Sequence, residues 1–295
     1  VNLPAISLVV GPMLTGSWRG ERLGACTDCR RQWGRYRAGD LDGPQIAEVE
    51  SELSTTAGTC MVMGTASTMA LMTETLGMML PGGATVPAVH AERLRIAERT
   101  GERAVGIVDK RLRPEEIMTP YAFSNAFRVL LAIGGSTNGL IHMTAVAGRL
   151  GITVDLDAFD RMGRETPVLV DLKPSGANYM EDLHKAGGLT SILRELSPLL
   201  HLDCKTVTGR TLGEEIEAAS TWPQNIVKSI HAPVNPEGGI AVLTGNLAPD
   251  SAIIKQSAAT PELLVHEGRA VVFDSLDDMA ERIDDPNLDV RKEDI

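Results

Sequence analysis

The most apolar stretch of the chain, residues 129–152, is broken near its start by the segment Gly134-Gly-Ser-Thr-Asn138. His142 and Arg149 also fall within it, so it lacks the uninterrupted apolar length that a membrane-spanning helix needs. Paired glycines end a helix, and Ser or Thr caps the helix that follows. The pattern therefore predicts two helices that meet at a glycine corner after Ile133.

The side chains available for a core point to close helix packing. Hydrophobic residues make up 43% of the chain but aromatic residues only 3%, so the core must use Ala, Val, Ile, Leu and the twelve Met. Short β-branched runs alternate with helical patterns, which indicates the α/β class. We expect strands over residues 6–10, 166–172, 240–245 and 269–273, and helices over 43–53, 60–77, 119–133, 180–185 and 276–283.

The length of 295 residues predicts one large domain and part of a second. A Pro/Gly-rich link at 233–239 separates the two, so we expect domains at 1–232 and 233–295, the second β-rich. The chain starts without Met in an apolar run and stops after a charged segment. Both ends look cut, and we expect a central piece of a longer protein.

Charge and cysteine content exclude several classes. The net charge is -11 and no basic stripe is present, which argues against nucleic acid as a partner. No signal peptide opens the sequence, and four Cys are too few for a secreted disulfide scaffold. We therefore expect a cytoplasmic protein with no membrane partner.

Cys60 lies where a small-residue loop runs into an expected helix. The N-terminus of a helix stabilises the thiolate form of a cysteine, and a thiolate can act as a nucleophile or as an iron ligand. Gly58 and Gly64 would let a bulky group approach the backbone. From the residues alone, a buried inert thiol is an equally good interpretation.

Cys26-Thr-Asp-Cys29 is the other cysteine motif. Two thiols at this spacing can chelate a metal or form a redox pair. A structural zinc site needs two further ligands with similar spacing, and the only other Cys are isolated at positions 60 and 204. Ordinary thiols in a loop are the competing interpretation.

Two further groups of polar residues admit both a functional and a structural interpretation. Residues 134–138 with His142 could bind a carboxylate at a helix start, or form a capped corner with a structural histidine. Glu181, His184 and Lys185 could form a reactive cluster, or a solvated helix with a Glu–Lys pair at i,i+4. The usual phosphate, dinucleotide and nucleophile-elbow motifs are absent from the sequence.

Several motifs in register resemble the dihydroxy-acid dehydratase and phosphogluconate dehydratase family. They cover nearly the whole chain and are Gly11-Pro-Met-Leu14, Gly20-Glu-Arg22, Ala57-Gly-Thr-Cys60, Gly64–Met69, Gly134–Asn138, Pro174-Ser-Gly176, Met180-Glu-Asp182, Ala186-Gly-Gly188 and Gly238–Asn246. The resemblance implies a helix-rich, layered N-terminal dehydratase domain followed by the start of a β-rich C-terminal domain.

The resemblance also implies a chemistry. Such enzymes remove water from a 2,3-dihydroxy acid to give a 2-keto acid, using an iron–sulfur cluster, a magnesium ion and a serine base. Cys60 matches the family's Gly-x-Cys cluster ligand. The other cluster and magnesium ligands would lie before Val1, and the serine and a further magnesium ligand beyond Ile295, so we expect this chain by itself to be inactive.

Within the family, Ser54-Thr55 stands where the branched-chain amino-acid enzymes usually carry Cys-Pro. The chain is more similar to arabinonate-type dehydratases, so the expected substrate is a sugar acid such as an aldonate. The resemblance favours a [2Fe–2S] over a [4Fe–4S] cluster, Mg²⁺ in the longer enzyme, and a homodimer or homotetramer. The alternatives are a branched-chain dihydroxy-acid dehydratase and a non-catalytic binding domain derived from the family.

Overall fold

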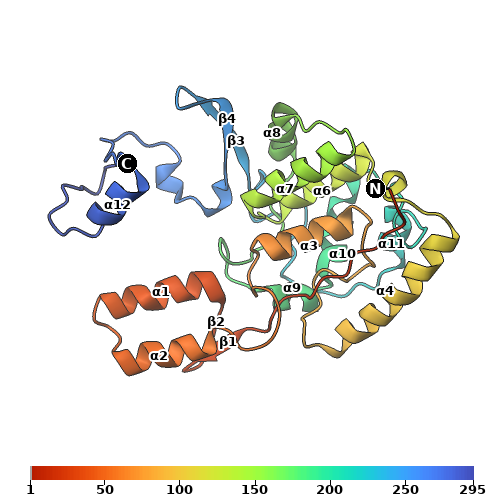
Figure 1. Ribbon diagram of the computed structural model, residues 1–295, viewed down its shortest axis with the longest axis horizontal. Helices are drawn as coiled ribbons and strands as arrows, with labels where there is room; N and C mark the ends of the chain where they lie inside the picture. Colours follow the sequence, from red (N-terminus) through yellow and green to blue (C-terminus); the bar gives the residue numbers. More distant parts are fainter. Residues whose placement is uncertain (1) are drawn as a thin grey trace. The chain divides into compact units, whose positions relative to one another are not determined.

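A computed structural model describes residues 2–295 of the chain (Figure 1). It divides into a large unit that ends at Ala258 and a small one, Ala259–Ile295. The small unit contains the 3-10 turn η3 (Pro261–Leu263) and the helix α12 (Leu276–Arg282). The predicted domain boundary near residue 232 stays a prediction.

The core of the large unit is built from helices that pack on one another. The helices α3 (Thr65–Thr75), α6 (Pro120–Ala132) and α7 (Thr137–Arg149) contact each other pairwise. Apolar side chains such as Met72 and Leu130 are fully buried where they meet. The scarcity of aromatic residues permits this close packing.

The glycine corner between α6 and α7 is confirmed. Gly134 has φ +51, a left-handed conformation that favours glycine, and Ser136 caps α7 by accepting a hydrogen bond from the Asn138 N–H at 3.3 Å. Thr119 caps α6 in the same way, with Pro120 in its first turn. Local sequence therefore determines both helices.

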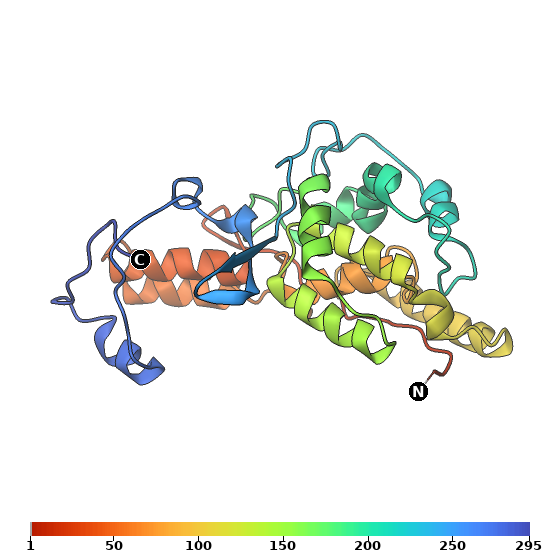
Figure 2. The ribbon, with the colours of Figure 1, turned by 90° about the horizontal axis from the view of Figure 1, so that it is seen from above.

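A helical hairpin follows the N-terminal segment. The helices α1 (Ala25–Arg37) and α2 (Gly43–Glu52) lie side by side (Figures 1 and 2), with a small ribbon of β1 (Gly16–Trp18) and β2 (Glu21–Leu23) beside α2. The α2 helix was predicted, and Asp42 and Gln45 form its capping box. The α1 helix was not predicted.

The remaining elements complete the large unit. They are α4 (Ala91–Asp109), α5 (Pro114–Ile117), α8 (Leu156–Glu165), α9 (Met180–Lys185), α10 (Gly188–Leu196), η1 (Ser197–Leu199), α11 (Leu212–Ala218), β3 (Ala241–Gly245), β4 (Ala248–Ile254) and η2 (Gln256–Ala258). The helix-rich domain followed by the start of a second one is as expected, and the two sheets of the described residues are two-stranded and antiparallel.

Three expected strands did not form. Residues 6–10 and 166–172 make only isolated bridges, such as Ser7 with Met79 and Val170 with Val227, and residues 269–273 lie outside any strand. A β-branched run becomes a strand only where a neighbouring segment pairs with it over several residues. No helix within residues 2–295 is long and apolar enough to cross a membrane.

Candidate functional site

Cys60 lies in the loop between α2 and α3, ahead of the α3 N-cap Gly64. The expected position at a helix N-terminus was therefore wrong, because the glycine at 64 delays the start of the helix. The N–H of Thr59 donates to the carbonyl of Gly11 at 2.9 Å, and the N–H of Met13 donates to the carbonyl of Thr59 at 2.8 Å. The loop is thus held against the Gly11–Met13 segment.

The sulfur of Cys60 is half-buried and surrounded by hydrogen-bonding groups. Burial raises the pKa of the thiol, while the backbone N–H groups of Val62 and Cys26 point at the sulfur and oppose the rise. The nearby Cys26 thiol raises this pKa further. The environment therefore favours the neutral thiol until a cation takes the place of its proton.

Cys26 and Cys29 both lie on α1. Cys26 lies in the first turn of α1, next to Cys60, whereas Cys29 is one turn farther along the helix. All four cysteines are free thiols. Residues 2–295 bring no three His, Cys, Asp or Glu side chains together as a metal site.

A buried charge network fixes the start of α1 to the Cys60 loop. Asp28 is only 2% exposed and accepts hydrogen bonds from Lys173 Nζ at 2.8 Å and from the Tyr179 hydroxyl at 2.8 Å. The Lys173 carbonyl accepts from the N–H of Met63 at 2.8 Å. Lys173 therefore joins the helix that carries Cys26 to the loop that carries Cys60.

The pKa values of this network follow from its contacts. Burial raises the pKa of Asp28, but hydrogen bonds from Lys173, the Gly24 N–H and Tyr179 outweigh burial and lower it overall. Burial lowers the pKa of Lys173, and its bonds to Asp28 and Tyr179 raise it overall. Both groups are thus charged at neutral pH. Sequence analysis missed all three residues, although Lys173 precedes the motif Pro174-Ser-Gly176.

The corner at 134–138 joins α3 to α7 through hydroxyl groups. Thr65 Oγ1 lies 2.9 Å from Ser136 Oγ and accepts a bond from the Asn138 amide at 3.1 Å. Thr68 Oγ1 accepts the Ser136 N–H at 3.0 Å. His142 is exposed. These contacts favour the capped-corner interpretation over a carboxylate site.

The cluster at α9 is largely a surface pair. Lys185 and Glu181 form the expected i,i+4 ion pair at 2.6 Å. His184 is half-buried, and its ring centroid lies 5.6 Å from that of His90. Burial is the main cause that lowers the pKa of His184, and the nearby His90 and Arg93 lower it further.

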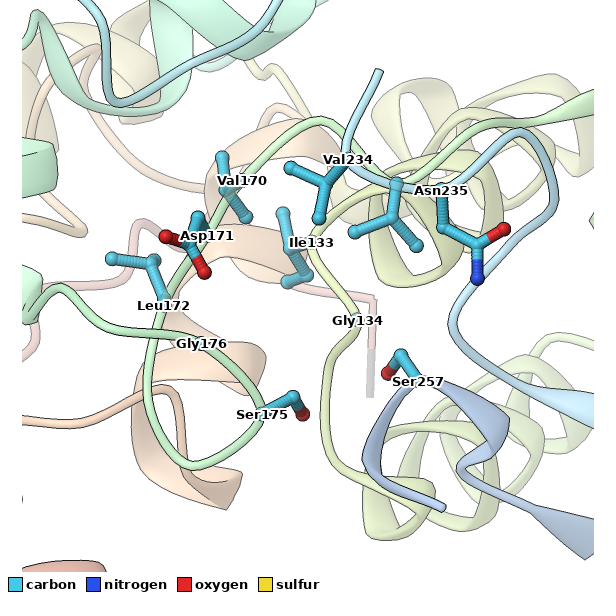
Figure 3. Close-up of a pocket in the computed structure, with 11 residues that line it drawn as sticks. Ile133, Gly134, Val170, Asp171, Leu172, Ser175, Gly176, Val234, Asn235 and Ser257 are labelled. Carbon is cyan, nitrogen blue, oxygen red and sulfur yellow. The ribbon is translucent and has the colours of Figure 1, made fainter. Parts of the chain in front are cut away.

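A pocket of about 200 Å³ lies beside the glycine corner (Figure 3). Ser175 and Ser257 lie on either side of the Gly134 turn, and Asp171 and Asn235 add a carboxylate and an amide to the wall. The rest of the lining is mainly aliphatic. This wall offers several hydrogen-bonding groups but no Lys or Arg among its described lining residues, so it suits neutral hydroxyl groups better than an anion.

The chain matches known families over almost its whole length. The model of the dihydroxy-acid/6-phosphogluconate dehydratase N-terminal domain matches residues 1–215, and that of the C-terminal domain matches residues 225–295. The chain belongs to this dehydratase family. The resemblance seen in the motifs is thereby confirmed.

Individual relatives are similar at more than 40% identity. The chain is 47% identical over 291 residues to an L-arabinonate dehydratase of Rhizobium leguminosarum bv. trifolii, covering 98% of this chain and 50% of the relative. It is 44% identical over 285 residues to a dihydroxy-acid dehydratase of Acetivibrio thermocellus, covering 96% of this chain and 51% of the relative. The chain thus spans about half the length of the curated relatives it matches.

Proposed function

We propose that this chain is part of an iron–sulfur-dependent hydro-lyase that converts a 2,3-dihydroxy acid to a 2-keto-3-deoxy acid. The observation that carries the proposal is the half-buried Cys60 thiol, held in a family loop by backbone bonds on both sides and lying near Cys26. A sulfur donor set of this kind suits iron rather than magnesium or calcium.

The cluster, when bound, would supply a Lewis acid for the hydroxyl group that leaves. Within this chain, Cys60 would hold one iron. The bond from Met63 to Lys173 and the bonds from Lys173 to Asp28 would keep the loop in place. On the family resemblance, we further propose that the cluster is of the [2Fe–2S] type. The longer enzyme would also use a Mg²⁺ ion and a serine base.

The proposed substrate is a sugar acid of the aldonate class. The hydroxyls of Ser175 and Ser257, with the Asn235 amide, provide partners for the extra hydroxyl groups of a sugar acid. A branched-chain dihydroxy acid has an aliphatic tail instead and would leave these groups unpaired. The alternative function, a dihydroxy-acid dehydratase, is supported by the relative that is 44% identical.

The test uses the chain expressed within its natural flanking sequence and kept anaerobic. L-arabinonate and 2,3-dihydroxyisovalerate are offered separately, and keto-acid formation is measured with semicarbazide. We expect turnover of the aldonate, and loss of both iron and turnover in Cys60→Ser. Turnover of dihydroxyisovalerate alone would favour the alternative, and turnover of neither would point to a non-catalytic binding domain. An iron-replete Cys60→Ser protein would overturn the ligand role of Cys60.

A further inference from the structure

The guanidinium group of Arg93 is buried and binds three backbone carbonyl groups. Arg93 lies in the first turn of α4 and is 7% exposed. Its Nη1 donates to the carbonyl of Val9 at 3.0 Å and to that of Gly83 at 2.9 Å, and its Nη2 donates to the carbonyl of Val86. Bonds from a charged donor are stronger than bonds between neutral groups. One side chain thus fastens α4 to two segments that are far apart in the sequence.

Glu74 supplies a countercharge and holds the same turn. Its carboxylate, on α3, is 6% exposed and accepts the N–H groups of Gly82 and Ala84, both at 2.7 Å. Arg93 binds the carbonyl of the residue between them, Gly83. The opposite charges of Glu74 and Arg93 attract each other. The carboxylate and the carbonyl groups together offset the cost of burying the cation.

Gly11 packs directly on this guanidinium group. A Cβ built on Gly11 would lie 2.4 Å from Arg93 Nη2 and 2.2 Å from the carbonyl oxygen of Val86. The φ of Gly11 is +91, a conformation that favours glycine. Because the backbone itself meets Arg93, a shift of the guanidinium group would move the backbone at Gly11.

The carbonyl of Gly11 in turn holds the loop that carries Cys60. It accepts the N–H of Thr59 at 2.9 Å and the Thr59 hydroxyl at 3.3 Å. The preceding residue, Gly58, packs so closely that a Cβ built on it would lie 2.4 Å from the backbone nitrogen of Met13. Thr59 directly precedes Cys60 in the chain. A continuous series of contacts therefore runs from Arg93 through Gly11 and Thr59 to the backbone of Cys60.

We propose that Arg93 is a positioning residue for Cys60: its guanidinium group fixes the Gly11 segment, and that segment fixes the backbone beside the thiol. The planar fork of an arginine can reach several carbonyl groups in fixed directions, whereas the ammonium group of a lysine is a single point of charge. The position of Cys60 as a ligand would then depend on Arg93. Only this consequence for iron, and not the positioning itself, rests on the proposed function.

The first experiment measures the reactivity of Cys60 in Arg93→Lys, with Arg93→Gln as a second variant in case a buried ammonium group prevents folding. The reduced, metal-free 295-residue chain is treated with iodoacetamide under native conditions. Mass spectrometry of its peptides gives the alkylation rate at each cysteine. We expect Cys60 to react about tenfold faster than in the wild type, because its loop opens more often. Cys204, which is also partly buried, should keep its wild-type rate.

Arg194 offers the matched control for a loss of stability alone. Its guanidinium group also binds backbone carbonyls, those of Ile216 at 2.8 Å and Ala219 at 2.9 Å, but these lie at the end of α11 and not in the segments that hold Cys60. Arg194→Lys and Arg194→Gln should therefore leave the alkylation rate of Cys60 unchanged. Circular dichroism and urea denaturation of all variants show that they are folded and compare their stabilities.

A double variant tests whether Arg93 acts through Thr59. Thr59→Val removes the hydroxyl bond to the Gly11 carbonyl and should by itself raise the Cys60 rate about threefold. If both residues belong to one series of contacts, the rate in Arg93→Lys/Thr59→Val should stay close to the rate in Arg93→Lys. Independent effects would multiply instead.

Three results would overturn the proposal. They are a folded Arg93 variant in which Cys60 keeps its wild-type rate, an equal acceleration at Cys60 in the Arg194 variants, and rates that multiply in the double variant. None of these measurements needs iron or turnover. The expected rates, found together with a longer enzyme that holds no iron and converts no dihydroxy acid, would contradict the proposed function alone.

Discussion

The Nζ of Lys173 lies 2.8 Å from Oδ1 of Asp28, although the two residues are 145 positions apart in the sequence. The carboxylate is 2% exposed and the lysine side chain 18% exposed, so water screens the pair poorly. The Tyr179 hydroxyl completes the arrangement at 2.8 Å from Asp28. This pair holds the segment of Cys26 and the segment of Cys60 in one place.

Removal of Lys173 should show how much its ion pair with Asp28 stabilises the folded chain. In Lys173→Met, the buried Asp28 carboxylate loses its countercharge, and we expect the free energy of unfolding to fall by about 3 kcal/mol. Urea denaturation followed by circular dichroism measures the change. Lys185→Met is the control, because its pair with Glu181 has a lysine that is 66% exposed and should contribute less than about 1 kcal/mol. Equal losses in the two variants would contradict the role of the buried pair.

The same pair predicts how its contribution varies with pH. The pKa of Asp28 is lowered by folding, so its contribution is complete above the unfolded value near 3.9 and is lost as the pH falls through the lower folded value. The pKa of Lys173 is raised, so its contribution is complete below about 10.4 and is lost above the folded value. The difference in stability between wild type and Lys173→Met should therefore stay constant from about pH 5 to pH 9. Denaturation series at pH 3, 5, 7 and 9 test this, and a difference that changes within the plateau would refute it.

Glu74 should produce a separate pH dependence near neutrality. Its carboxylate is buried in α3 and accepts the N–H groups of Gly82 and Ala84, both at 2.7 Å, yet burial raises its pKa to about 7. A raised pKa means that the folded state binds the proton more tightly, so stability should fall as the pH rises from about 4.5 to about 7. The shift corresponds to a loss of roughly 3 kcal/mol.

Comparison with a variant that cannot titrate isolates this effect. Glu74→Gln should remove most of the slope between pH 5 and pH 8, measured by urea denaturation at each pH. Glu50→Gln, at an exposed position on α2, should keep the wild-type slope. If Glu74→Gln also keeps the wild-type slope, another group is responsible for the pH dependence of stability.

Gly24 offers a steric test of how tightly the start of α1 packs. Its φ of -123 is open to any residue, so Gly24→Ala acts only through the Cβ that would meet the Tyr179 ring at 2.5 Å. We expect a loss of about 1–3 kcal/mol in the free energy of unfolding.

Gly34→Ala is the matched control on the same helix. A Cβ at Gly34 meets nothing within 4 Å, so alanine should stabilise α1 by roughly 0.5–1 kcal/mol. Calorimetric unfolding of both variants makes the comparison. A Gly24→Ala variant as stable as the wild type would show that the Tyr179 ring yields to the added methyl group.

Local sequence determined the helices with strong end signals. The caps Asp42, Thr119 and Ser136 and the paired glycines after α6 act within a few residues, so α2, α6 and α7 could be predicted closely. The motif around Cys60 likewise carries the family resemblance and the expected cluster ligand within a few consecutive residues. Such signals need no knowledge of distant parts of the chain.

Tertiary structure alone decided what surrounds that ligand. The strands expected at 6–10 and 166–172 failed because pairing depends on a partner segment, which a single run does not specify. Sequence spacing suggested Cys29 as the partner of Cys26, yet chain folding brings Cys60 to it instead. The Asp28–Lys173 bond forms for the same reason: a buried charge requires a countercharge, and only the folded chain determines which residue is close enough to supply it.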